Sequence, residues 1–443
     1  MATEFRFLAE PIEPSLPEVH ASVRISRSPI YWRRLLGFLG PGFLISVGYM
    51  DPGNWATDIG GGSQFGYTLL SVIMISNLMA VLLQSLSLKL GVATERDLAQ
   101  LCRESYGRWA SFGLWVGAEI AIAACDLAEV IGSAIALNLL FHIPLFYGVL
   151  ITGLDVLLIL LLQRWGFRWV EALVITLIGT IIAMFGVQLV LSKPEYWPAF
   201  KNLFIPSPSI ITNPDMLYIA IGMLGATVMP HNLYLHSSIV QSRNYKRTPE
   251  GKREAIFMAN VDSALALTLA LFVNAAIVVV AAAVFNRSGH FEVAAIQDAY
   301  KLLSPLVGAA WASTLFAIAL LASGQNSSIT GTLAGQVVME GFIHLRLSPW
   351  LRRMITRTLA IIPTIIVVAI TGERGTEKLL LLSQVILSLQ LSFAVVPLVI
   401  FTGSRKKMGE FVNGRWLQGL SWFVAALIAG LNAWFLVLMF HGQ

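Results

Sequence analysis

Charged residues are scarce in this sequence. Of its 443 residues, 12% are Asp, Glu, Lys or Arg and 56% are hydrophobic. Soluble domains carry about 25% charged residues, so this chain has too few of them to coat two or three water-soluble domains. The composition therefore indicates a membrane protein, and the lipid bilayer is the first partner we expect.

Cysteine and the common catalytic motifs are missing too. The two cysteines, Cys102 and Cys125, are too few for a disulfide framework or a thiolate zinc cluster. No HExxH or GxSxG pattern occurs, and no stretch resembles a soluble catalytic domain. We expect no enzyme, no cofactor and no obligate protein partner. The net charge of +5 does not indicate nucleic-acid binding, because the basic residues fall in short loops between apolar runs.

The N-terminal 34 residues lack the apolar stretch of a signal peptide. They are polar and rich in proline, which favours a disordered cytoplasmic tail over residues 1–34 and a single membrane domain over 35–443. Eleven apolar runs in that domain are long enough to cross a bilayer as helices. They are 37–62, 67–90, 110–141, 146–163, 169–192, 215–240, 255–285, 302–344, 350–371, 378–402 and 417–440.

The loops between these runs predict the orientation. If the N-terminus is cytoplasmic, 24 of the 30 Lys and Arg residues fall on the cytoplasmic side, as the positive-inside rule requires. We therefore expect a multi-pass protein of the cell membrane with its C-terminus outside the cytoplasm.

The first span is interrupted by Gly48-Tyr-Met-Asp-Pro-Gly-Asn-Trp55, which puts an acid, a proline and a glycine side by side. Pro52 lacks an N–H and clashes with the preceding turn, so the helix cannot run straight through it. We expect the chain to unwind over residues 48–53, which frees backbone carbonyls inside the membrane. A carboxylate at this depth is costly without a partner, which points to a functional site.

The sixth span repeats the interruption at Pro230, within Gly222-Met-Leu-Gly-Ala-Thr-Val-Met-Pro-His-Asn232. Two interrupted spans in corresponding positions of two halves are typical of transporters built from inverted repeats. Spans 1–5 and 6–10 would form the halves, since an odd number of spans reverses the second half. The predicted fold class is an all-α polytopic membrane protein with discontinuous spans 1 and 6.

The two interruptions offer donors for a cation. Asp51 has a carboxylate, Asn54 an amide oxygen and Met229 a thioether sulfur. Freed carbonyls near Gly48 and Ala226 add oxygens. Oxygen donors alone suit magnesium or calcium, whereas a soft sulfur favours transition metals. A lone methionine in an apolar span usually serves packing, but the combination of donors favours a divalent metal site.

At these residues the sequence resembles the Nramp family of divalent metal and proton symporters. Asp51-Pro-Gly-Asn54 and Met229-Pro-His231 match its two signature motifs, and Gly324–Gly341 in the eighth span resembles its transport signature. The resemblance implies a LeuT-type fold that imports manganese or ferrous iron, and also cobalt or cadmium, with proton symport by alternating access. The metal-site residues that it implies are Asp51, Asn54, Met229, the carbonyls of Ala226 and Gly48, and Gln384 as a group that approaches the metal.

The third span carries three acids, Glu119, Asp126 and Glu129. Asp126 and Glu129 share one helix face, where two carboxylates at this depth would repel each other if both ionised. Arg352 and Arg353, at the cytoplasmic start of the ninth span, are the expected charge partners. A structural salt bridge is the alternative to proton transfer. The proton route that the resemblance implies contains Asp126, Glu129, His231 and one of the two arginines, with Glu119 and His236 as further members.

Four more acids lie in or beside the spans. For Asp262 and Glu340 the sequence leaves two roles open, helix partners or lining of a vestibule. Asp155 and Glu171 flank the loop between the fourth and fifth spans, where we expect them to be solvated.

Three other functions stay open. An amino-acid or organic-cation carrier on the same fold would aim helix N-termini at a substrate carboxylate and use small residues for a roomy pocket; Asp51 with Met229 fits a bare cation better. An intramembrane zinc enzyme would need Asp51, His231 and His236, but the two histidines are five apart and face different sides of a helix. A channel would carry ions without saturation or dependence on a proton gradient.

Overall fold

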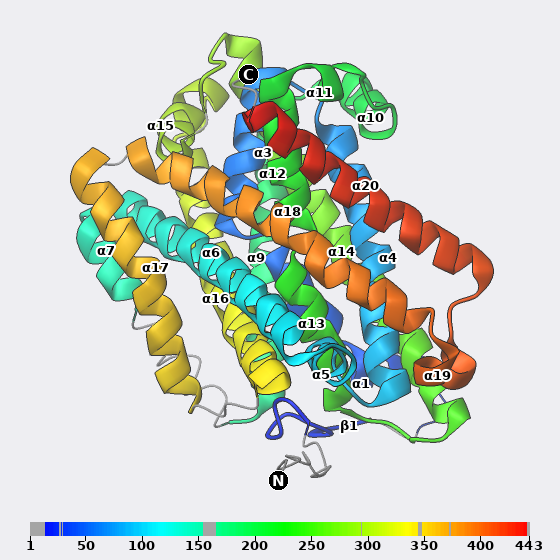
Figure 1. Cartoon of the computed structure of the whole chain (residues 1–443). Helices are drawn as coiled ribbons and strands as arrows, with labels where there is room; N and C mark the ends of the chain where they lie inside the picture. Colours follow the sequence, from blue (N-terminus) through cyan, green and yellow to red (C-terminus); the bar gives the residue numbers. More distant parts are fainter. Residues whose placement is uncertain are drawn as a thin grey trace.

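Helices make up most of the described residues (Figure 1). The computed structural model describes residues 14–25, 28, 30–153, 165–293, 295–343, 348–371 and 374–440. The helices of the bundle are α2 (Pro41–Gly48), α3 (Pro52–Phe65), α4 (Leu70–Thr94), α6 (Arg108–Phe141), α7 (Leu145–Thr152), α9 (Phe167–Ser192), α12 (Pro214–Thr227), α13 (Pro230–Ile239), α14 (Pro249–Val284), α16 (Ala312–Ile343), α17 (Pro349–Thr371), α18 (Arg374–Thr402) and α20 (Arg415–Phe440).

Shorter elements cover the two ends of the bundle. One end carries β1 (Val23–Arg24), α1 (Tyr31–Phe38), α5 (Leu98–Ser105), η1 (Val240–Ser242), β2 (Arg243–Asn244), α19 (Arg405–Met408) and η3 (Gly409–Phe411). The other carries α10 (Tyr196–Phe204), α11 (Ser209–Thr212), η2 (Asn286–Ser288) and α15 (Ile296–Val307). Figure 1 shows β1 at the first end and the C-terminal end of α20 at the second, as an odd number of spans requires.

Seven segments of the described chain are long and apolar enough to cross a membrane: α4, α6, α9, α12 continued by α13, α14, α18 and α20. The other four of the eleven spans differ for separate reasons. The first is split into α2 and α3, and the fourth is α7 followed by residues 154–164, which lie outside the described residues. Helix α16 contains the polar run Gly324–Thr332. Among its described residues, helix α17 is apolar only over Arg357–Val367, a stretch shorter than the seven segments above.

The eighth span begins later than the predicted 302–344. Residues up to Val307 belong to the separate helix α15, which ends at Gly308, and α16 starts at Ala312. Gly308 has a φ of 77°, a left-handed conformation that glycine adopts without a steric cost and that ends a helix. The apolar run is therefore two helices joined by a turn.

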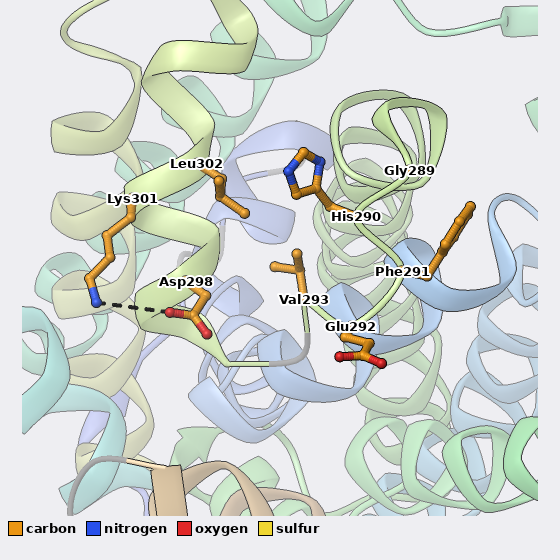
Figure 2. A pocket seen from close by; sticks show the side chains of 8 residues that line it. All are labelled: Gly289, His290, Phe291, Glu292, Val293, Asp298, Lys301 and Leu302. Carbon is orange, nitrogen blue, oxygen red and sulfur yellow. Dashed lines mark ion pairs between the residues drawn. The ribbon is translucent and has the colours of Figure 1, made fainter.

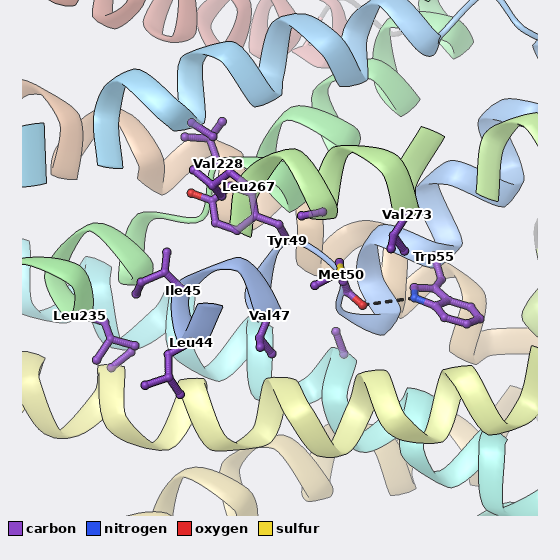
Figure 3. Close-up of a cluster of buried hydrophobic side chains, with 14 of the residues drawn as sticks. Leu44, Ile45, Val47, Tyr49, Met50, Trp55, Val228, Leu235, Leu267 and Val273 are labelled. Carbon is purple, nitrogen blue, oxygen red and sulfur yellow. Dashed lines mark hydrogen bonds between the residues drawn. The ribbon is translucent and has the colours of Figure 1, made fainter. Parts of the chain in front are cut away.

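Both interrupted spans lie inside the bundle. Helix α3 packs against α14, α12 against α18, and α6 against α16, left of the centre of Figure 1. Gly132 of α6 permits the first interruption to approach closely, because a Cβ there would lie 2.1 Å from the Cβ of Pro52. Figure 3 shows the apolar side of the same interruption, where Val47, Met50 and Trp55 join the main hydrophobic core.

The structure describes part of the tail that was expected to be disordered over residues 1–34; residues 1–13, 26, 27 and 29 lie outside the described residues. Residues 14–25 are described, and β1 pairs in parallel with β2. Leu16, Val19 and Val23 are 2%, 7% and 5% exposed and belong to the main core. The polar, proline-containing composition predicted disorder, but these three apolar side chains are spaced so that they reach the end of the bundle together.

Candidate metal site

The first helix interruption covers Tyr49–Asp51, between the last residue of α2 and Pro52 at the first position of α3. Asp51 caps α3, since its Oδ1 accepts hydrogen bonds from the backbone N–H and from Nδ2 of Asn54, both at 2.7 Å. The residue is fully buried, and its Oδ2 has no hydrogen-bond partner. One oxygen of a buried acid is therefore available to a cation.

The carbonyls freed by the interruption have partners. Asn274 Nδ2 of α14 donates to the Tyr49 carbonyl at 2.8 Å. The Met50 carbonyl accepts from Trp55 Nε1 at 3.2 Å, the dashed line in Figure 3, and from Ser323 Oγ at 2.5 Å. These contacts provide the unwound backbone with hydrogen-bond donors from the protein itself, as non-helical chain buried at membrane depth requires.

Three oxygens converge on the side chain of Asn54. Its Nδ2 donates to Asp51 Oδ1 at 2.7 Å, to the Gly48 carbonyl at 3.2 Å and to the Ala226 carbonyl at 3.1 Å. The amide nitrogen thus occupies the point where these acceptors would hold a cation. Rotating the amide by half a turn directs its oxygen toward the same point, so Asn54 can serve as a ligand without moving its backbone.

The second interruption meets the first. Helix α12 ends at Thr227, and Met229, which is fully buried, is the N-cap of α13. Its Sδ lies 3.2 Å from the position that a Cβ on Gly48 would take. That added Cβ would also lie 2.3 Å from Asn232 Nδ2, so glycine at position 48 allows the two interruptions to touch.

Gln384 of α18 packs against the start of α3, next to the first interruption. A Cβ on Gly53 would lie 1.7 Å from Gln384 Nε2, so the amide lies directly against the first interruption. Its Oε1 is buried and has no hydrogen-bond partner. All six residues predicted for the metal site therefore gather in one place, although they come from three separate parts of the chain.

The acids of α6 face α16. Asp126 and Glu129 are fully buried, and Glu129 Oε1 accepts from Ser327 Oγ at 2.8 Å. Gly331 makes room for both acids, because a Cβ there would lie 2.9 Å from Glu129 Oε1 and 3.2 Å from Asp126 Oδ1. A larger residue at position 331 would push one carboxyl group away.

The arginine beside these acids is Arg357, which the sequence analysis did not single out. It is 2% exposed, its Nη2 lies 3.5 Å from Glu129 Oε2, and its Nη1 donates to the Asp126 carbonyl at 3.5 Å. The side chains of Arg352 and Arg353 lie outside the described residues, so their role stays a prediction. One feature of the sequence could have indicated Arg357 as the partner of these acids: it lies one helical turn farther into the apolar run of α17 than Arg353.

The two histidines of α13 take different directions. Both ring nitrogens of buried His231 lack a partner. The Nδ1 of His236 instead pairs with Gln84 Oε1 at 2.9 Å, and Gln84 Nε2 donates to Tyr49 Oη at 2.8 Å. Glu119 is half-buried and accepts from Trp115 Nε1 at 3.1 Å.

Asp58 is a buried acid that the sequence analysis missed. It is 2% exposed, and its Oδ2 has no hydrogen-bond partner. It follows Asn54 by four residues and Asp51 by seven on α3, so all three lie on one face of the helix. That spacing was visible in the sequence.

Two acids outside the metal site hold neighbouring segments together near it. Asp262 of α14 accepts from the N–H groups of Gly40 and Gly42 at 3.1 and 2.6 Å, which makes it a helix partner. Glu171 was expected to be solvated, but it is 1% exposed and pairs with buried Arg243 at 2.7 Å. The expectation was wrong because Arg243 folds back into the bundle instead of staying in its loop.

A surface pocket of about 500 Å³ lies elsewhere, beside η2 and α15 (Figure 2). His290 and Asp298 line it, and Asp298 faces Lys301 at 3.9 Å. None of the predicted site residues takes part. Across the described residues, no group of three His, Cys, Asp or Glu side chains is arranged to hold a metal; the donors at the two interruptions are of mixed type instead.

A polytopic helical bundle with two broken helices that enclose buried donors defines a membrane transporter, not an enzyme. Residues 42–438 match the profile of the family described as Nramp, natural resistance-associated macrophage protein-like, and the chain belongs to that family. The protein named divalent metal cation transporter MntH of Nostoc sp. is 62% identical over 424 residues, covering 96% of each chain. Its namesake in Listeria innocua is 60% identical over 423 residues, covering 96% of this chain and 94% of that one.

Solved structures agree with the family and the fold. The Eremococcus coleocola manganese transporter superposes with a TM-score of 0.88 at 45% identity, covering 95% of this chain and 90% of that one. Mhp1, a nucleobase-cation-symport-1 family transporter, gives a TM-score of 0.63 at 14% identity, which supports the fold alone. The predicted inverted-repeat architecture is confirmed at this level.

Proposed function

We propose that this protein imports divalent transition-metal ions, manganese and ferrous iron first, by alternating access with proton symport. The observation that carries the proposal is the convergence of a carboxylate, an amide, two carbonyls and a thioether at two helix interruptions. One negative charge among neutral donors suits a divalent ion that must be released again. The names of the relatives support the same substrate class.

Proton coupling is the less direct part of the proposal. Glu129 is buried between Arg357 and Ser327, on helix α6, which packs directly against the first interruption. A carboxyl group in such a place can bind and release a proton without touching the metal. Its position supports a proton route that runs from the site past α6 toward the end of the bundle with α5.

We propose the orientation of the protein in the membrane from the distribution of its Lys and Arg residues. Basic residues at the end with β1 and α5 form ion pairs there, such as Lys252 with Glu95 at 2.7 Å and Arg34 with Glu254 at 2.8 Å. An excess of Lys and Arg in short loops marks the cytoplasmic side. This end would therefore face the cytoplasm in the cell membrane, and the site's ion would enter from the end with α10, α11 and α15.

Uptake into proteoliposomes tests the proposal. Radiolabelled manganese should enter in a saturable manner and faster when the outer side is more acidic than the lumen. Saturable uptake that ignores the pH gradient would contradict symport, and uptake without saturation would indicate a channel. Uptake of an amino acid in place of manganese would favour the alternative carrier on this fold.

Met229→Ala should change selectivity more than manganese transport. A neutral sulfur gives the hard ions calcium and magnesium almost nothing, whereas manganese tolerates it and cadmium gains from it. We expect moderate manganese uptake, a loss of cadmium uptake of about tenfold or more, and inhibition by millimolar calcium that wild type resists. The matched control is Met223→Ala, which removes a buried methionine of α12. Equal resistance to calcium in Met229→Ala and wild type would mean that Met229 only packs.

A further inference from the structure

The N-terminal segment Pro14–Arg24, called here the N-terminal strap, crosses the end of the bundle beneath the metal site. Its backbone and side chains bind two different groups of helices. On one side, Ser238 Oγ of α13 donates to the Ser15 carbonyl at 3.4 Å, and the Ala21 N–H donates to the Gln241 carbonyl of η1 at 3.0 Å. The ladder between β1 and β2 continues this side.

The other side of the strap is fixed to α16 and to the start of α5. The Leu16 N–H donates to Glu340 Oε2 at 3.0 Å, and Gln336 Nε2 donates to Glu18 Oε1 at 3.1 Å. Ser15 Oγ donates to Asp97 Oδ2 at 2.6 Å, next to the N-terminus of α5. The strap therefore joins α13 to α16 across the line where they meet.

An ion released toward the strap would have to pass near the contact between α13 and α16. The donors of the site are fully buried, and α2 and α13 are the halves of the broken helices that lead from them toward the strap. Helix α13 packs against α16 here, so an exit that opens along this line would separate the two helices. Because the strap holds both helices, separation breaks its contacts on at least one side and exposes Leu16.

We propose that the N-terminal strap is an intramolecular clamp that closes the metal site toward the end with α5, and that it must detach before the ion can leave there. The proposal rests on alternating access as the proposed function. Weakening the strap should shift the population toward the state open at this end, because the clamp places these contacts in the closed state and not in the open one.

Leu16→Ala combined with Val19→Ala tests the clamp in the full chain, since it removes two buried anchors and leaves the polar contacts in place. Cys125 serves as the reporter because it packs against Met229 at the site and is 1% exposed; Cys102→Ser leaves it as the sole thiol. The measurement is the rate at which a small, charged, membrane-impermeant thiol reagent modifies Cys125 from each side of oriented vesicles.

The clamp predicts that the rate from the strap side rises about tenfold, the effect expected when a few buried contacts are lost, while the rate from the opposite side does not rise. Glu340→Ala, which acts on the α16 side of the same contact, should raise it in the same direction. Arg24→Ala, an exposed residue of the strap, is the matched control and should match wild type.

Two results would overturn the clamp. One is an unchanged rate from the strap side in both variants, and the other is an equal rise from both sides, which would mean general loosening of the bundle. Failure of the proposed function looks different: wild type would then take up no manganese, whatever the labelling of Cys125 shows.

Discussion

Manganese uptake by Asp51→Ala is expected to fall to background, at least about 100-fold below wild type, since even the loss of an outer-shell partner typically costs 10- to 100-fold in metal affinity. Asp51 supplies the only formal charge among the donors that converge on Asn54, and its Oδ2 is free to bind. Without it, a dehydrated divalent ion would face only neutral donors. The measurement is radiolabelled manganese uptake by purified protein in proteoliposomes.

Asp51 also caps α3, so its second role needs its own control. Asp51→Asn keeps an oxygen that can accept from the Asn54 N–H, because asparagine is as good an N-cap as aspartate. It should fold like wild type and still fail to take up manganese. Asp215→Asn, an exposed acid in the first turn of α12, should leave uptake unchanged. Near-normal uptake by folded Asp51→Ala would remove Asp51 from the site.

Glu129→Gln should reduce metal-stimulated proton entry on the order of 100-fold, the scale of losing a positioned proton-transfer group, while metal binding changes little. Glutamine keeps the shape of the side chain and can accept from Ser327 Oγ, but it cannot ionise. Acidification of the vesicle lumen, recorded together with manganese uptake, measures the coupling. Glu195→Gln, at the N-cap of α10, is the control.

A purely structural ion pair would give a different result. Glu129→Gln leaves Arg357 buried without an ionised partner at Glu129, which costs about 3–5 kcal/mol when a buried pair is broken. Glu129→Gln with Arg357→Gln removes both charges and should recover part of the thermal stability. If the double variant also recovers proton entry, the pair is structural. If acidification follows uptake unchanged in both Glu129→Gln and Asp126→Asn, the proton takes another route.

The sequence predicted the class of protein and the location of the site because that chemistry is local. A chain with so few charged residues does not form a soluble fold, however its helices pack. Pro52 and Pro230 interrupt their helices whatever residues surround them. An acid beside such an interruption predicts a site for the same reason. These features could be recognised without knowing which helices are neighbours.

Residue pairings across the fold could not be predicted in this way. Which arginine of α17 reaches Glu129 depends on the face that α17 turns toward α6, and in the structure that residue is Arg357. Burial of Arg243 against Glu171 likewise requires a loop to fold back over a distant helix. The periodicity of apolar residues within one helix does not show which of its faces packs against a particular neighbouring helix.

The sequence by itself determined that this is a polytopic transporter of the Nramp family, and it predicted a mixed oxygen and sulfur site, because proline, carboxylate and thioether have the same local chemistry whatever surrounds them. The tertiary structure alone decided that Met229 lies beside Gly48, that Gly331 admits two carboxyl groups, and that the N-terminal strap binds both α13 and α16. Each of these contacts joins segments far apart in the chain. They form only because burying apolar surface fixes how the helices pack, and that packing is a property of the whole chain.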